Sequence, residues 1–150
     1  MSKRNSLILL VVLVLVSFVV SYNKTKSEKP VIKIGVTLPL TGDVASVGIA
    51  SQTAMNMALD KWKTKNTKYD YQLVFEDNKL MPSKIATNTN RLISVEKVDA
   101  VASIWGFVDV IKGIIQDREI INFACSWGTS ASEGEYNFNH STPPLLKLQL

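Results

Sequence analysis

Short apolar runs rich in β-branched residues alternate with segments whose apolar residues recur at helical spacing, and this alternation limits the fold more than any other feature. The runs cover residues 31–38, 71–77, 98–105 and 120–125. The first run is followed by Pro39 and Gly42, which stop a strand. Strands that alternate with helices favour right-handed crossovers and a parallel sheet. We therefore predict an α/β fold, a parallel sheet with helices on both faces.

Three helices are expected between these strands. The first is predicted to begin near Val44 with Asp43 as its N-cap, and the second to run from Pro82 to about Val95. In the first and third helices, apolar residues recur every three or four positions, which gives each helix one apolar face. These residues are Val47, Ala50, Ala54, Ala58 and Trp62 in the first helix, and Phe107, Val110, Ile111, Ile114 and Ile115 in the third.

The carboxyl ends of the predicted strands are the place to look for a binding site, because ligands of parallel α/β sheets bind beyond those ends. The corresponding segments are 40–48, 77–79, 105–107 and 125–129. A fifth, short strand is expected at 136–140. Pro143 and Pro144 then precede a new apolar run that reaches Leu150, so we expect a chain truncated just after the start of a further helix.

The turn after the first strand, within TLPLTGDVASVG, does not fit a phosphate loop. Gly42 and Gly48 have five residues between them and no Lys follows, unlike the Walker motif. The dinucleotide fingerprint is also absent, and the acid at Asp77 lies more than thirty residues past Gly42 instead of about 20. Gly42 is expected to permit the turn. The free N–H groups of the next helix favour an anion, and a carboxylate serves as well as a phosphate.

Charge and composition exclude several function classes. Without residues 1–21, the net charge falls from +4 to +2, too little to indicate nucleic-acid binding. The single Cys125 and the single His140 exclude an internal disulfide framework and a Cys-rich or multi-His zinc site. A Cys125–His140 catalytic pair is formally compatible with the sequence. We prefer a small buried Cys at a strand end and a surface His, and expect neither enzyme activity nor a cofactor.

The amino terminus has the organisation of a signal peptide. Lys3 and Arg4 precede an apolar core from Leu7 to Val20, which is shorter than the roughly 20 apolar residues of a membrane span. We predict a signal peptide at 1–21, with cleavage before Tyr22, and a polar linker at 22–30. A retained membrane anchor is the alternative. In either case the rest of the chain is expected to be exported.

Several segments together resemble one family. They are IKIGVTLPLTGDVASVG, MALDKW, LVFEDNK and VDAVASIW followed by IINFACSWGTSA. They resemble the amino-terminal part of the type I periplasmic substrate-binding proteins of ABC importers, in the branched-chain amino-acid branch, from Val31 to about Pro144. The resemblance implies two Rossmann-like α/β lobes that close on a ligand. Residues 31–150 would then form part of lobe one.

The resemblance also implies a site and partners. An amino acid or similar small carboxylate would meet hydroxyl and backbone N–H groups, and the closed protein would dock on a membrane ABC permease in the periplasm. The third-strand loop reads WGFVD, where the family often has Ser and Thr. The alternatives are the ectodomain of a membrane-anchored sensor and an exported α/β enzyme using Cys125 or Ser126. The implied ligand-binding residues are Trp105, Gly106, Phe107, Ser126, Trp127, Gly128, Thr129 and Val47.

Overall fold

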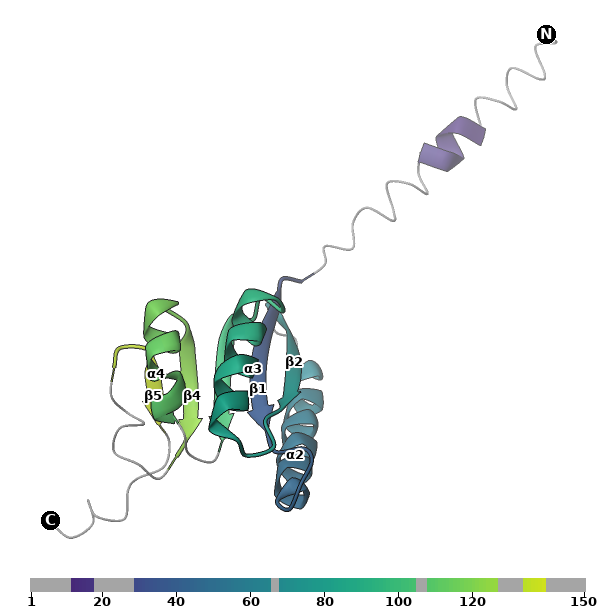
Figure 1. Cartoon of the computed structure of the whole chain (residues 1–150). Helices are drawn as coiled ribbons and strands as arrows, with labels where there is room; N and C mark the ends of the chain where they lie inside the picture. Colours follow the sequence, from purple (N-terminus) through teal and green to yellow (C-terminus); the bar gives the residue numbers. More distant parts are fainter. Residues whose placement is uncertain (1–11, 18–28, 66–67, 105–107, 127–133, 140–150) are drawn as a thin grey trace, which may run out of the picture.

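The computed structural model describes residues 12–17, 29–65, 68–104, 108–126 and 134–139, and these contain one parallel sheet flanked by helices (Figure 1). The strand order is β2-β1-β3-β4-β5. The predicted α/β fold with a parallel sheet is therefore confirmed. The strands are β1 Val31–Leu38, β2 Asp70–Asp77, β3 Ala100–Ile104, β4 Ile121–Cys125 and β5 Asn137–Asn139, and the helices are α2 Ala45–Lys63, α3 Pro82–Ser94 and α4 Val108–Asp117.

The predicted strands differ from the observed ones only at their ends. The third strand begins at Ala100 and not at Val98, because the Val98 amide donates to the Leu92 carbonyl at the end of α3. The fourth begins one residue late for a similar reason, since the Ile120 amide donates to the Ile115 carbonyl. Residues 12–17 are helical and exposed. No helix in the described ranges is both long and apolar enough to cross a membrane.

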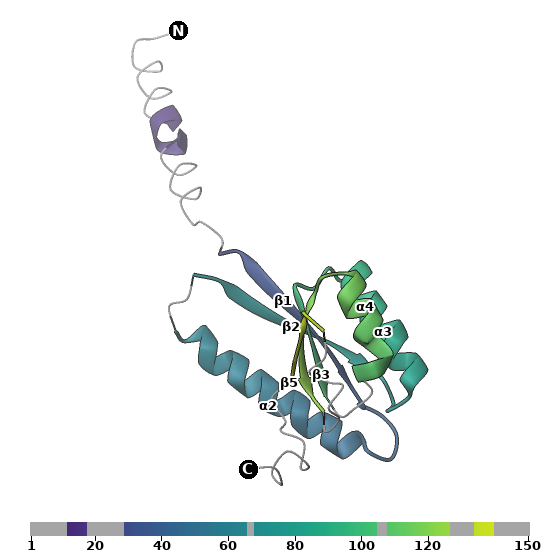
Figure 2. The ribbon, with the colours of Figure 1, turned by 90° about the vertical axis from the view of Figure 1, so that its left-hand side faces the viewer.

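Helices α3 and α4 cover one face of the sheet and form the main core with it (Figure 2). Gly35 in β1 leaves the space that Leu92 fills, because a Cβ at Gly35 would lie 3.0 Å from Leu92 Cδ1. The predicted stripe of the third helix is correct for Ile111 and Ile115 but wrong for Val110, which is exposed. The fully or nearly buried core residues are Ile85, Leu92, Val98, Val101, Ile111, Ile115 and Ile120.

Helix α2 lies on the opposite face, against β1 and β2 (Figure 2). Its predicted apolar face is wrong at Ala50 and Ala54, which are exposed. Ala58 and Trp62 are also exposed, but they lie on the side of the helix that faces the sheet. The only fully buried residue of the helix is Gly48. A Cβ there would lie 2.0 Å from the Pro39 carbonyl oxygen, so this close approach to the preceding loop sets the rotation of the helix.

The predicted N-cap of α2 is also wrong. The N-cap residue is Val44, and no side chain caps the helix. The turn is closed instead by the backbone, because the Ala45 amide donates to the Gly42 carbonyl over 3.1 Å. Gly42 has φ +93°, in the region that favours glycine, which confirms its predicted role in the turn.

Candidate functional site

The carboxyl ends of the five parallel strands lie at one edge of the sheet, and we call this edge the carboxyl rim. The described residues at the rim are those after β1 (39–44), those after β2 (78–81) and Ser126 after β4. The start of α2 continues from the first of these loops, which places Val47 near the rim.

Asp77, the last residue of β2, holds the loop after β1. Its Oδ1 accepts hydrogen bonds from the amides of Leu40 (2.9 Å) and Thr41 (3.3 Å), and also from the amide of Lys79 (3.0 Å). Its Oδ2 accepts one from the Thr41 hydroxyl over 2.6 Å. The strands end in register, with Leu38 opposite Asp77, so the loop turns back directly over this carboxylate.

These hydrogen bonds favour the ionised form of Asp77. Partial burial acts to raise the pKa of its carboxyl group, but the hydrogen bonds from the Thr41 hydroxyl and from the amides of Lys79, Leu40 and Thr41 together outweigh burial. The pKa is therefore lowered from its ordinary value of 3.8. At neutral pH Asp77 is an ionised acceptor, and bonds to such a group are shorter and stronger than neutral ones.

Asn139, the last residue of β5, engages the residue that follows β4. Its Nδ2 donates to the Ser126 carbonyl over 3.0 Å, and its Oδ1 accepts from the Ser126 amide over 3.3 Å. In the strand register Asn139 pairs with Ala124. Its side chain therefore continues the hydrogen bonding between β4 and β5 two residues further, to Ser126. The buried Asn122 and Asn137 add a second amide contact between the same strands, Nδ2 to Oδ1 over 2.9 Å.

Only part of the predicted site falls on described residues. Ser126 is at the rim but is 5% exposed, so its side chain lies below the surface. Val47 is half-buried. Trp105, Gly106, Phe107, Trp127, Gly128 and Thr129 lie outside the described residues, as does His140 of the Cys125–His140 pair. Asn139 was missed, although Asn at alternate positions of a short strand was a signal for an amide contact between strands.

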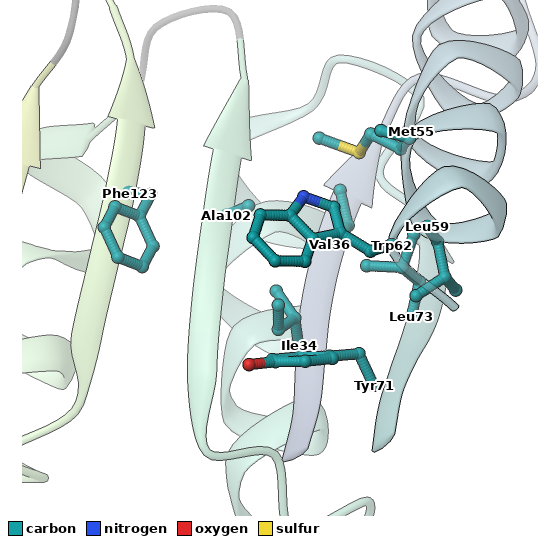
Figure 3. A pocket seen from close by; sticks show the side chains of 10 residues that line it. Ile34, Val36, Met55, Leu59, Trp62, Tyr71, Leu73, Ala102 and Phe123 are labelled. Carbon is teal, nitrogen blue, oxygen red and sulfur yellow. The ribbon is translucent and has the colours of Figure 1, made fainter. Parts of the chain in front are cut away.

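A second feature lies away from the rim, between α2 and the sheet (Figure 3). It is an apolar cavity of about 370 Å³. Met55, Leu59 and Trp62 project from α2 toward it, and Phe123 faces it from β4 (Figure 3). The remaining lining residues are Ile34, Val36, Ala58, Tyr71, Leu73 and Ala102. The wall of this cavity has no charged side chain, and its polar side-chain groups are the Tyr71 hydroxyl and the Trp62 indole N–H.

The described residues offer no site for a metal ion, because no three of their His, Cys, Asp and Glu side chains are grouped together. Cys125 is half-buried at the end of β4. At the described rim, the backbone amides of Leu40 and Ser126 already donate to Asp77 and Asn139, so these two side chains hold the loop backbones in place.

Three solved structures of binding proteins have a fold similar to that of this chain. A possible leucine/isoleucine/valine-binding protein from Rhodopirellula baltica superposes with a TM-score of 0.73 at 23% identity, over 79% of this chain and 34% of its own. The substrate binding protein LivJ of Streptococcus pneumoniae, in complex with isoleucine, superposes with a TM-score of 0.68 at 22% identity. The match covers 75% of this chain and 34% of LivJ. A solute binding protein of an ABC transporter from Rhodopseudomonas palustris, in complex with 3,4-dihydroxybenzoic acid, superposes with a TM-score of 0.68 at 17% identity. The match covers 75% of this chain and 32% of that protein. These likenesses establish the fold.

The family follows from a match along most of the chain. The family described as periplasmic binding protein matches residues 31–144. The chain therefore belongs to the periplasmic binding protein family, as the sequence resemblance indicated. It spans about one third of the length of the solved structures that it matches. No curated protein sequence matches it.

Proposed function

We propose that this chain is part of an extracytoplasmic solute-binding protein that delivers an amino acid or a similar small carboxylate to an ABC importer. The observation that carries the proposal is the family match over residues 31–144, which includes the whole described sheet and its carboxyl rim. The bound isoleucine and 3,4-dihydroxybenzoic acid of the two related structures both carry a carboxyl group. This shared group is the reason for proposing a carboxylate.

We place the ligand at the carboxyl rim. Val47 and Ser126 are the described members of the proposed site. Its other members are Trp105, Gly106, Phe107, Trp127, Gly128 and Thr129, from the loops after β3 and β4. Backbone N–H groups of such loops can donate charge-assisted hydrogen bonds to a carboxylate. The Thr41 hydroxyl is already bonded to Asp77, so it supports the loop and does not serve the ligand.

We propose that the chain consists of a segment for export, a linker and part of a binding lobe. Residues 1–21 would be a signal peptide, 22–30 a linker and 31–150 part of an amino-terminal lobe. The protein would act outside the cytoplasmic membrane, in the periplasm, and dock on a membrane permease as a binding protein without enzyme activity. Sites for small molecules bury about 70–90% of the ligand. One lobe covers one side only, so we expect this lobe alone to bind weakly.

A ligand panel tests the proposal. Leucine, isoleucine, valine and 3,4-dihydroxybenzoate would each be compared with the methyl ester of the same compound, by thermal shift and calorimetry. The proteins would be the 150-residue chain and the product purified from the native cell envelope. A ligand at 100 times its Kd adds about 2.7 kcal/mol to stability. We expect one acid to raise the Tm of the native product and its ester not to. Equal effects of acid and ester, or no effect of any compound, would refute the proposal.

A further inference from the structure

We propose that Asp77 and Asn139 are positioning residues of the carboxyl rim, which fix the backbones of two ligand-facing loops before any ligand arrives. The two residues have equivalent places in the fold. Each is the last residue of an edge strand of the described sheet, β2 on one side and β5 on the other. Each side chain bonds the backbone just beyond the neighbouring inner strand, β1 or β4. The inference rests on the proposed function for the role of these loops.

Asp77 determines the position of the first loop. Two successive amides, those of Leu40 and Thr41, both point at its Oδ1. Residues 39–42 lead directly into α2, and the Pro39 carbonyl lies where a Cβ of Gly48 would be. A loop held at Leu40 therefore also holds the first turns of α2, including Val47. The Asp77 carboxylate therefore fixes the loop after β1 relative to the end of β2, without contacting the ligand itself.

Asn139 determines the position of Ser126, the residue that follows β4. Its amide group bonds both the N–H and the C=O of Ser126, as a strand residue would. The polypeptide leaving β4 is thus kept in line with the sheet for at least one residue past Cys125. The backbone N–H groups that follow Ser126 belong to the proposed site.

Binding by such a rim needs little reordering, and ordering a loop on binding weakens affinity. Loss of either side chain should therefore act on affinity as well as on the local backbone. A hydrogen bond to a charged group is strong enough for its loss to change an equilibrium about tenfold or more. The effect should be larger for Asp77, which accepts four hydrogen bonds as an ionised group, than for Asn139, whose two hydrogen bonds to Ser126 are between neutral groups.

The variants are Asp77→Ala, Asp77→Asn and Asn139→Ala, with Asp99→Ala as the matched control. Asp99 also accepts a backbone bond, from the Lys33 amide over 2.7 Å, but it precedes β3 at the opposite edge of the sheet. Asp77→Asn keeps one oxygen acceptor and should restore part of the effect. Asn139→Asp keeps the acceptor for the Ser126 amide and loses the donor to its carbonyl, which separates the two bonds.

The first measurement is amide hydrogen exchange by NMR on the 150-residue chain. We expect Asp77→Ala to lower protection at Leu40, Thr41 and Lys79 by about tenfold or more, with core amides unchanged. Asp99→Ala should leave those three amides as they are. Unchanged protection in Asp77→Ala, or an equal loss in Asp99→Ala, would overturn the positioning role. This result does not depend on any ligand.

The second measurement is the affinity of the native product for leucine and for 3,4-dihydroxybenzoate. We expect Asp77→Ala to weaken the binding of whichever probe the unsubstituted protein takes by about tenfold, and Asp99→Ala to leave it within about twofold. Equal affinities of the unsubstituted protein and Asp77→Ala would overturn the inference. If the unsubstituted protein binds neither probe, the proposed function fails at that step, and the exchange data still decide whether the loops are fixed by these side chains.

Discussion

Gly48 offers a direct test of how α2 is held against the rim. A Cβ at this position would lie 2.0 Å from the Pro39 carbonyl oxygen and 2.7 Å from its carbon. Carbon and oxygen atoms in non-bonded contact are normally about 3.3 to 3.6 Å apart. Gly48→Ala must therefore move the helix and the loop apart by about 1.3 Å or more. The obstacle is backbone, and Asp77 fixes the neighbouring Leu40.

The expected free energies come from two opposing effects. Overpacking of this kind costs about 1 to 3 kcal/mol. Replacing Gly by Ala inside a helix contributes about 1 kcal/mol in favour of folding. Gly48→Ala should therefore destabilise the chain by about 0 to 2 kcal/mol. The control is Gly113→Ala in α4, where a Cβ would have no atom within 4 Å, and this variant should be stabilised by about 0.5 to 1 kcal/mol.

The assay is urea unfolding of both variants, followed by circular dichroism at 25 °C. The helix contribution is common to both substitutions, so the difference between them isolates the clash and should be about 1 to 3 kcal/mol. If Gly48→Ala stabilises the chain as much as Gly113→Ala, within about 0.5 kcal/mol, the close approach of α2 to Pro39 does not exist in solution and the reasoning is refuted.

Three further outcomes are expected. Leu92→Ala should destabilise the chain by about 2 to 5 kcal/mol in urea unfolding, because Leu92 is fully buried, whereas exposed Val95→Ala should change stability by no more than about 0.5 kcal/mol. The pKa of Asp77 is lowered on folding, so its contribution to stability is present above the unfolded value near 3.8 and is lost as the pH falls through the folded pKa. The difference in unfolding free energy between the unsubstituted chain and Asp77→Asn, measured along an acid titration, should therefore shrink as the pH falls below about 3.8 and stay constant at higher pH. Phe123 and Phe138 are 54% and 53% exposed on the α2 face of the sheet, so replacing both with Ser should lower the binding of a hydrophobic dye by the 150-residue chain, and unchanged dye fluorescence would show that this face is covered.

The strands and their order along the chain could be predicted from the sequence because each strand is a compact apolar run. The rotation of α2 could not. Its alanines are spaced like a core face, but Ala50 and Ala54 are exposed, and the contact of Gly48 with Pro39 decides which side meets the sheet. A close approach between a helix and its own preceding loop is a tertiary fact, which leaves no periodic signal in the sequence.

Strand β4 shows a second limit of the sequence. Apart from Asn122, its residues form an apolar run, which predicts burial on both faces. In the structure polar Asn122 is buried and apolar Phe123 is half-exposed. The Nδ2 group of Asn122 donates to Asn137 Oδ1 in the neighbouring strand, whereas the buried Oδ1 of Asn122 has no hydrogen-bond partner among the described residues. Phe123 stays exposed because, among the described elements, α2 contacts β1 and β2 and leaves β4 uncovered on that face.

The location of the candidate site stays a prediction, and the contacts that support the loops there could not be predicted from the sequence. The rule that ligands bind beyond strand ends indicates the segments after all four main strands, including the loops after β1 and β4. The bonds from Asp77 to Leu40 and from Asn139 to Ser126 join residues 37 and 13 positions apart. Such pairs depend on strand order and register, and both were known only once the sheet was described.

The most direct test of the central claim is an NMR titration of the ¹⁵N-labelled chain with leucine and with 3,4-dihydroxybenzoate. The claim is that a small carboxylate binds at the carboxyl rim of this sheet. It predicts that the amide signals of Leu40, Val47 and Ser126 shift with added ligand. Shifts confined to Leu59 and Leu73, which line the apolar cavity under α2, or no shifts at all, would contradict it.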